Sequence, residues 1–380
     1  MYNLPELIRS EAFLEALETS LTGDGPPPLL RDAKIKLTSH CNLRCVMCKY
    51  WQTESEEALT SERWRQVFAE LAGAGCRKVH FSGGEVFLRR DFLDLVEAAR
   101  ECQLKVNITT NGTLIDRERA RRLARLGVNS VSISLDAPTA TAHDRIRGQR
   151  HAFKRSVRAI RRLRAESDRL RVRINFVVMR HNFRRLPAMV TLAGELGAQE
   201  LLPMPVDETE ARKHRLSASQ ILEYNRTIAP EVQALRERYH FSTDPALVYP
   251  FGVTQDEVKL STRGMYARGF FERRACLVPW LHAFFAWNGE TYLCCMTNGR
   301  MESLGNVGRQ SVREIFEGPG YQRVRAEFAA GRHLTSCERC DLFLRENALL
   351  HSALDQTRER RRAVGDGARR DSGSLNLLGQ

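Results

Sequence analysis

The chain has 380 residues, of which 42% are hydrophobic and 28% charged, a composition typical of globular proteins rather than disordered or collagen-like ones. Its 59 lysine and arginine residues outnumber the 46 acidic residues, and the net charge of +13 permits an anionic substrate or partner without requiring one. No apolar run reaches the roughly 18 residues of a transmembrane helix, and the amphipathic N-terminus lacks the apolar core of a signal peptide. We therefore expect a cytoplasmic protein with no membrane partner.

Five segments are predicted along the chain. Proline and glycine punctuation, the alternation of strand-like and helical patterns, and shifts in composition set their boundaries. The segments are an N-terminal helix and proline-rich linker at 1–32, an α/β core at 33–206, a connecting segment at 207–270, a small cysteine-rich domain at 271–350, and a basic, disordered tail at 351–380.

The core segment alternates six short β-rich runs with stretches of helical periodicity. This pattern predicts parallel strands joined by right-handed crossovers, and six such units form an α/β fold of the partial (β/α)6 barrel type. The runs are 34–37, 78–81, 105–109, 130–135, 171–178 and 200–204. In such barrels, catalytic groups gather at the carboxyl ends of the strands, so we expect the residues after each run to share one mouth.

The first run is followed by Cys41, Cys45 and Cys48, with the spacing C-x3-C-x2-C. Three thiolates on one short loop can hold three irons of a [4Fe–4S] cluster and leave the fourth iron open to a small chelating ligand. A zinc site is the alternative, although zinc usually takes four ligands, in close pairs from two segments.

With the segments that follow the next three runs, this triad resembles the radical S-adenosylmethionine (SAM) superfamily over about residues 33–206. The matching segments are Ser82-Gly83-Gly84-Glu85, Arg89-Arg90-Asp91, 109–113 and 132–136, and the sequence departs at Val86, where the family most often has proline. The resemblance implies that the open iron binds SAM. One electron then cleaves SAM to methionine and a 5′-deoxyadenosyl radical, which abstracts a hydrogen atom from the substrate.

The resemblance also implies which residues bind SAM. Gly83 and Gly84 would bring the backbone close to the methionine end of SAM, because they have no Cβ atom, and Glu85 would accept a hydrogen bond from its ammonium group. Met47 and Met204 are similar to positions that pack on adenine, although each is equally compatible with a place in the hydrophobic core.

Other polar residues near the expected mouth have two interpretations. Ser134 is similar to a position that contacts the SAM carboxylate, but it is also compatible with capping a neighbour. Asn111 and Asp136 are expected as ordinary turn residues. Arg147 or Arg155 would neutralise the SAM carboxylate or, as the many arginines of this chain favour, be solvated surface charges.

A second set of cysteines lies beyond the core. It comprises Cys276, Cys294, Cys295, Cys337 and Cys340. A predicted hairpin at 284–292 and a helix at 312–316 separate the members, and the last two are spaced like two ligands of one metal centre. The arrangement resembles the SPASM and shortened twitch extensions of the family, which carry auxiliary [4Fe–4S] clusters, and a zinc ribbon is the alternative.

Five cysteines are too few for the two clusters of a full SPASM domain. The resemblance therefore implies one auxiliary [4Fe–4S] cluster with the ligands Cys276, Cys294, Cys337 and Cys340. Cys295 then replaces Cys294 as a ligand, is a passive neighbour, or donates hydrogen to a substrate radical.

The resemblance implies an oxidoreductase or epimerase for a small sugar or aminocyclitol, of the kind found in antibiotic biosynthesis, reduced by a flavodoxin or ferredoxin. The alternative is a maturase of a ribosomally made peptide, for which the roughly 30 residues before the first strand leave no room for a leader-binding domain. A zinc-dependent nucleic-acid binder is the third hypothesis, and it lacks an interleaved aromatic and basic stripe.

Overall fold

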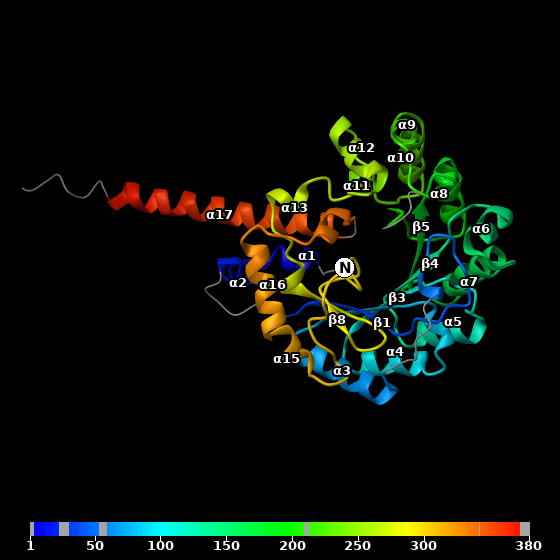
Figure 1. Cartoon of the computed structure of the whole chain (residues 1–380), viewed down its shortest axis with the longest axis horizontal. Helices are drawn as coiled ribbons and strands as arrows, with labels where there is room; N and C mark the ends of the chain where they lie inside the picture. Colours follow the sequence, from blue (N-terminus) through cyan, green and yellow to red (C-terminus); the bar gives the residue numbers. More distant parts are fainter. Residues whose placement is uncertain (1–3, 23–29, 53–58, 209–212, 342, 373–380) are drawn as a thin grey trace, which may run out of the picture.

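The computed structural model describes residues 4–22, 30–52, 59–208, 213–341 and 343–372, with side chains up to residue 361. Eight strands form one curved sheet in the order β6-β5-β4-β3-β2-β1-β7-β8, and Figure 1 shows helices around its outside. Neighbours pair in parallel, except that β8 is antiparallel to β7. The strands are β1 (Asp32–Lys36), β2 (Lys78–Ser82), β3 (Lys105–Thr110), β4 (Ser130–Ser134), β5 (Arg171–Val178), β6 (Glu200–Pro205), β7 (His282–Phe285) and β8 (Thr291–Tyr292).

The helices that follow the first five strands lie on the convex side of the sheet. They are α3 (Ser61–Gly73), α4 (Phe92–Glu101), α5 (Arg117–Arg125), α6 (Ala140–Arg147), α7 (Ala152–Glu166) and α8 (Leu186–Glu195). The predicted partial (β/α)6 barrel is confirmed, and each of its six strands begins and ends within two residues of the predicted run.

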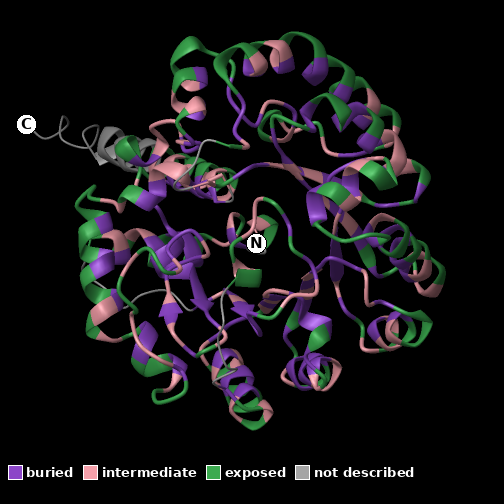
Figure 2. Ribbon diagram, turned by 45° about the vertical axis from the view of Figure 1, so that its right-hand side comes forward, coloured by how far each residue is buried: buried purple, intermediate pink, exposed green. Residues whose placement is uncertain are grey.

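The two faces of the sheet differ in polarity. Every second residue of the central strands, such as Ile35, Phe81 and Ile133, is apolar and buried against the helices. Figure 2 shows this as buried strands and inner helix faces within a largely exposed periphery. The alternate positions, which face away from the helices, include Lys34, Lys36 and other polar residues. The side of the sheet that would meet a substrate is therefore the polar one.

The connecting segment and the C-terminal region are mainly helical. Short helices follow β6: α9 (Ala218–Glu223), a π-helical turn (Tyr224–Ile228), α10 (Ala229–Arg238), α11 (Pro245–Val248), α12 (Gln255–Thr262) and α13 (Phe270–Arg273). Around β7 and β8 lie α14 (Val278–Leu281), α15 (Val312–Phe316), α16 (Pro319–Ala329), the 3-10 helix Thr335–Arg339 and α17 (Leu344–Ser372). The predicted hairpin at 284–292 is present as β7 and β8.

Sequence reasoning missed the attachment of this hairpin to the barrel. β7 pairs in parallel with β1, with Asp32 opposite His282, so the C-terminal region extends the core sheet. Asp32 is fully buried and contacts His282 Nδ1 at 2.6 Å and Lys78 Nζ at 3.1 Å, which ties three adjacent strands together.

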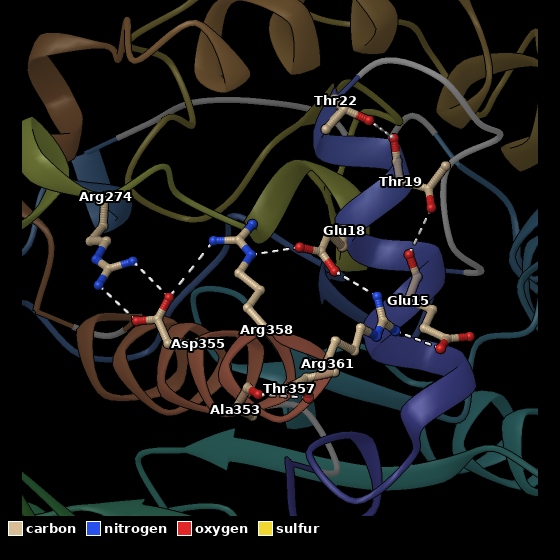
Figure 3. A network of polar contacts seen from close by, with 10 residues as sticks. All are labelled: Glu15, Glu18, Thr19, Thr22, Arg274, Ala353, Asp355, Thr357, Arg358 and Arg361. Atoms are coloured by element: carbon tan, nitrogen blue, oxygen red, sulfur yellow. Dashed lines mark hydrogen bonds and ion pairs between the residues drawn. The ribbon is translucent and has the colours of Figure 1, made fainter. Parts of the chain in front are cut away.

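The predicted disordered tail is wrong for residues 351–372, which lie in α17. This helix packs near α2 (Glu11–Thr22), and its Leu350 and Leu354 side chains are buried. Figure 3 shows the polar contacts beside this packing, in which Arg358 and Arg361 bind acidic residues of α2. Burial and ion pairing supply the stability that the charged sequence lacks by itself. The linker at 23–28 and the chain end at 373–380 lie outside the described residues.

No helix in the described part of the chain is long and apolar enough to cross a bilayer.

Candidate active site

The loop that carries Cys41, Cys45 and Cys48 leaves the carboxyl end of β1 and is held by the loop after β2. Gly84 N donates to Thr38 O at 2.8 Å, and Glu85 N donates to His40 O at 2.7 Å. A Cβ atom at Gly83, whose φ is +154°, would lie 2.5 Å from Thr38 O. The glycines are therefore needed for the approach of two protein loops, and their predicted contact with SAM stays a prediction.

Glu85 faces the protein interior. Its fully buried carboxylate accepts hydrogen bonds from Thr110 Oγ1 at 2.6 Å, from Asn111 N at 2.8 Å and from Phe87 N at 3.2 Å. Burial raises its pKa, which these hydrogen bonds partly oppose. The residue thus fastens the end of β3, and its predicted bond to the SAM ammonium is a further role that no contact here tests.

Asn111 is more than a turn residue. Its side chain is 7% exposed and its Nδ2 donates to Asn42 Oδ1 at 2.9 Å. Asn42 in turn donates to Thr113 Oγ1 at 2.9 Å. Since Asn42 follows Cys41 directly, this network links the first cysteine to the end of β3.

The expectation that Arg147 and Asp136 are a solvated charge and an ordinary turn residue is wrong. Arg147 is 8% exposed, Asp136 is fully buried, and Arg147 Nη2 lies 2.7 Å from Asp136 Oδ2. Arg147 Nη1 also lies 3.7 Å from Cys45 Sγ. Arg155 is exposed, as the sequence predicted.

The remaining SAM-binding candidates are half-buried around the strand ends. Met47 packs on a small apolar group that includes Ile146 and Val206, while Ser134 ends β4. Met204 lies on β6. Their positions are compatible with both interpretations made from the sequence, so their SAM contacts remain predictions.

The second cysteine set gathers four thiols from three segments. Burial raises the pKa of the Cys276 and Cys340 thiols well above its usual range. Neighbouring thiols make smaller contributions in the same direction. Charges on Cys337 and Cys294 raise the pKa of Cys276, and charges on Cys294 and Cys276 raise the pKa of Cys340. All four residues are buried in the same part of the fold, and charges on their thiols would affect one another. Asn347 of α17 adds an Nδ2 donor 3.8 Å from Cys276 Sγ.

Cys295 has different surroundings from Cys294. It is half-buried, and a negative charge on its thiol would raise the pKa of Lys36 and of Tyr50, which lie on the side of the first cysteine loop. Lys36 Nζ lies 3.1 Å from the centre of the Tyr50 ring, and burial, the largest cause, lowers its pKa to about 7. Cys294, by contrast, is buried like Cys276, Cys337 and Cys340, and we therefore expect Cys294 to be the ligand.

The donor chemistry fits iron–sulfur clusters at both places. Burial raises the pKa of Cys41 to about 11, so its thiol is neutral unless a bound cation draws off the proton. Within the described ranges, no three His, Cys, Asp or Glu side chains are arranged to hold a single metal ion. The structure shows one group of thiols at the expected mouth of the barrel and a second group beside it.

Two families of known sequences match the chain. The family described as "Radical SAM superfamily" matches residues 35–193, and the "Iron-sulfur cluster-binding domain" called SPASM matches residues 276–341. The chain thus contains a radical SAM domain followed by a SPASM iron–sulfur domain. Its cofactors are SAM, the [4Fe–4S] cluster that binds SAM, and one auxiliary [4Fe–4S] cluster. Zinc is thereby set aside at both cysteine sets.

Individual curated relatives match this chain over part of its length. The Fe-coproporphyrin III synthase of Methanosarcina barkeri is 37% identical over 42% of this chain and 40% of its own length. The PqqA peptide cyclase of Gluconobacter oxydans is 38% identical over 43% of this chain and 46% of its own length. The chain thus spans less than half the length of these two curated relatives.

Solved structures extend the likeness in fold to the C-terminal region. SuiB of Streptococcus suis, solved with bound S-adenosylmethionine, superposes with a TM-score of 0.64 at 16% identity. The match covers 85% of this radical SAM protein and 75% of SuiB.

Sequence reasoning missed Lys36 as a site residue, and it named Arg147 as a candidate without predicting its contacts with Asp136 and Cys45. The signal for Lys36 was present, because Asp32, Lys34 and Lys36 alternate on a strand whose other face is apolar. Arg147 carries no such signal, since its partner Asp136 lies on a separate element and only the fold brings them together.

Proposed function

We propose that this radical SAM enzyme modifies a peptide by removing a hydrogen atom from one of its C–H bonds. Similarity to the PqqA peptide cyclase, over 43% of this chain, is the observation that carries this proposal. It replaces the sugar or aminocyclitol oxidation inferred from sequence motifs as the favoured function. SAM and its cluster, when bound, supply a 5′-deoxyadenosyl radical, and a flavodoxin or ferredoxin is the proposed electron donor.

The residues of this chain organise the site for that chemistry. The loops after β2 and β3 fix the ends of the cysteine loop through the backbone of Thr38 and His40 and the side chain of Asn42. Rigid support of this kind keeps reacting groups within the narrow range of distance and angle that hydrogen transfer needs.

The charge on the polar face of the sheet bears on the substrate class. Among the described residues, no acidic side chain forms an ion pair with Lys34 or Arg173, both of which lie on that face. An amine-bearing aminocyclitol would meet repulsion there, whereas a carboxylate-bearing substrate would be attracted. A peptide with acidic side chains fits this charge.

A small carboxylated metabolite is the second candidate. The same cationic face accommodates it, and one relative is named as a synthase of Fe-coproporphyrin III. For either substrate, we propose that Cys295 returns a hydrogen atom to a substrate radical. The thiyl radical left on Cys295 would then take one electron from the flavodoxin or ferredoxin and one proton from solvent.

The radical SAM chemistry is tested with the anaerobically reconstituted chain, dithionite and SAM. We expect release of 5′-deoxyadenosine, measured by liquid chromatography, and no release from Cys45→Ala, because three thiolates are needed to hold the cluster. Cys102→Ala, which alters a half-buried cysteine outside both sets, is the control and should behave like the parent chain. Release that persists in Cys45→Ala would contradict the site.

The substrate is tested by adding synthetic short peptides encoded beside the gene. Mass spectrometry should show loss of hydrogen, or uptake of solvent deuterium, only with SAM and dithionite. Conversion of a carboxylated small metabolite with every peptide unchanged would overturn the peptide proposal and leave the radical chemistry intact.

A further inference from the structure

The carboxyl end of α6 forms one wall of the loop that carries the first cysteine set. Arg44 N donates to Arg147 O at 3.1 Å, and Val46 N donates to Ile146 O at 3.0 Å. These two bonds flank Cys45 on both sides. The helix ends at Gly148, whose φ is +65° and where a Cβ atom would collide with Arg44 O. The backbone of α6 therefore sets the position of Cys45.

The side chain of Arg147 reaches the sulfur of the same cysteine. Nη1 donates to Cys45 Sγ at 3.7 Å, and Nη2 pairs with Asp136 Oδ2 at 2.7 Å. Asp136 is itself fixed, because its Oδ1 accepts a hydrogen bond from Val177 N at 2.8 Å. The guanidinium is thus held by a carboxylate that is itself fixed by the backbone.

Burial strengthens the electrostatic interactions of Arg147 with Cys45 and Asp136. Arg147 is 8% exposed and Asp136 is fully buried, so water screens their charges poorly. Arg147 Nε is also buried, with no hydrogen-bond partner among the described residues. The Nε–H donor is therefore left unused by the described residues.

We propose that Arg147 is a positioning residue that raises the reduction potential of the SAM-binding cluster through Cys45, and that Asp136 moderates this effect. Hydrogen bonds to cysteine sulfur and nearby positive charge both stabilise the reduced form, which carries one more electron. The inference rests on Cys45 as a ligand but not on any choice of substrate.

The test is a potentiometric titration of the reconstituted full chain, followed by electron paramagnetic resonance. The signal that changes on addition of SAM identifies the cluster to be followed. For Arg147→Met, we expect a more negative midpoint potential, because the variant loses a donor and leaves the Asp136 charge unbalanced. At a fixed potential, the ratio of reduced to oxidised cluster should fall by about tenfold, which corresponds to about 59 mV for one electron.

Two further variants distinguish an electrostatic effect on the reduction potential from a general disturbance of the structure. Asp136→Asn removes the negative charge and should move the potential in the opposite direction. Arg147→Lys keeps the charge without the planar fork and should restore part of the loss. Arg145→Met, on an exposed residue of the same helix, is the matched control and should leave the potential unchanged.

Iron content distinguishes the outcomes. An unchanged potential in Arg147→Met with full iron content would overturn the proposal. Equal shifts in the same direction for Arg147→Met and Asp136→Asn would also overturn it, since a general disturbance acts without regard to sign. If Arg147→Met fails to hold iron, Asp136→Asn and Arg147→Lys carry the test. None of these measurements needs a substrate, so failure of the peptide proposal would not affect them.

Discussion

Cys294 and Cys295 are adjacent in the chain but have different neighbours. The backbone N–H of Cys294 donates to Thr297 Oγ1 at 3.1 Å, and its thiol lies within electrostatic range of Cys337. A charge on Cys295 would instead raise the pKa of Lys36, which lies on the polar face of the barrel. The sequence could place both residues near a second cluster but left the choice of ligand open. Because the two cysteines are adjacent, their sequence distances to every other cysteine differ by only one residue.

The choice is tested by iron content. We expect Cys294→Ala to lose the auxiliary cluster, or about four of about eight irons per chain, whereas Cys295→Ala retains all of them. Iron and sulfide analysis of the anaerobically reconstituted variants measures this. Normal iron in Cys294→Ala together with loss in Cys295→Ala would reverse the assignment.

At the scale of elements, the six core strands could be predicted because each has a strong local pattern and is followed by a helix. The pairing of β7 with β1 and the packing of α17 on α2 could not, since periodicity shows that an element exists but not which distant element it meets. Asp32 illustrates the difference. Burial would raise its pKa, but Lys78 and His282 outweigh burial and hold it well below the usual value of 3.8.

Asp32→Asn should therefore lower the free energy of unfolding by about 3 kcal/mol, because it leaves the Lys78 ammonium without its buried counter-charge and weakens the hydrogen bond to His282. A carboxylate with a depressed pKa stabilises the fold above its unfolded pKa, so the difference between variant and parent should narrow as the pH falls below 3.8. Urea unfolding at pH 7 and below pH 4 measures this. Asp168→Asn, at a carboxylate that is 96% exposed, is the control, and an equal loss there would contradict the prediction.

The whole molecule is a barrel wall continued by a C-terminal region, with the N-terminal helix and α17 packed together at one side. Figure 1 shows α17 projecting outward from this body. Two kinds of contact hold it: buried leucines, and arginines paired with acidic residues of α2. Their energies differ, since exposed ion pairs contribute little in water.

Leu354→Ala should accordingly cost about 2–4 kcal/mol of unfolding free energy, and Arg361→Ala less than about 1 kcal/mol. Leu354 is 2% exposed, whereas the side chain of Arg361 is 47% exposed. Chemical denaturation compares the two variants. A larger loss in Arg361→Ala would show that charge, not burial, fastens the helix.

The pairing of β1 with β7 has a consequence for electron flow. The loop with the first three thiols leaves the end of β1, and the hairpin that leads to Cys294 begins with β7, one strand away. A slip of one residue between these strands would displace one redox centre relative to the other by about 3.3 Å and turn His282 away from Asp32. Backbone hydrogen bonds, and not a flexible tether, thus set the separation of the two cysteine sets and of any redox centres that they hold.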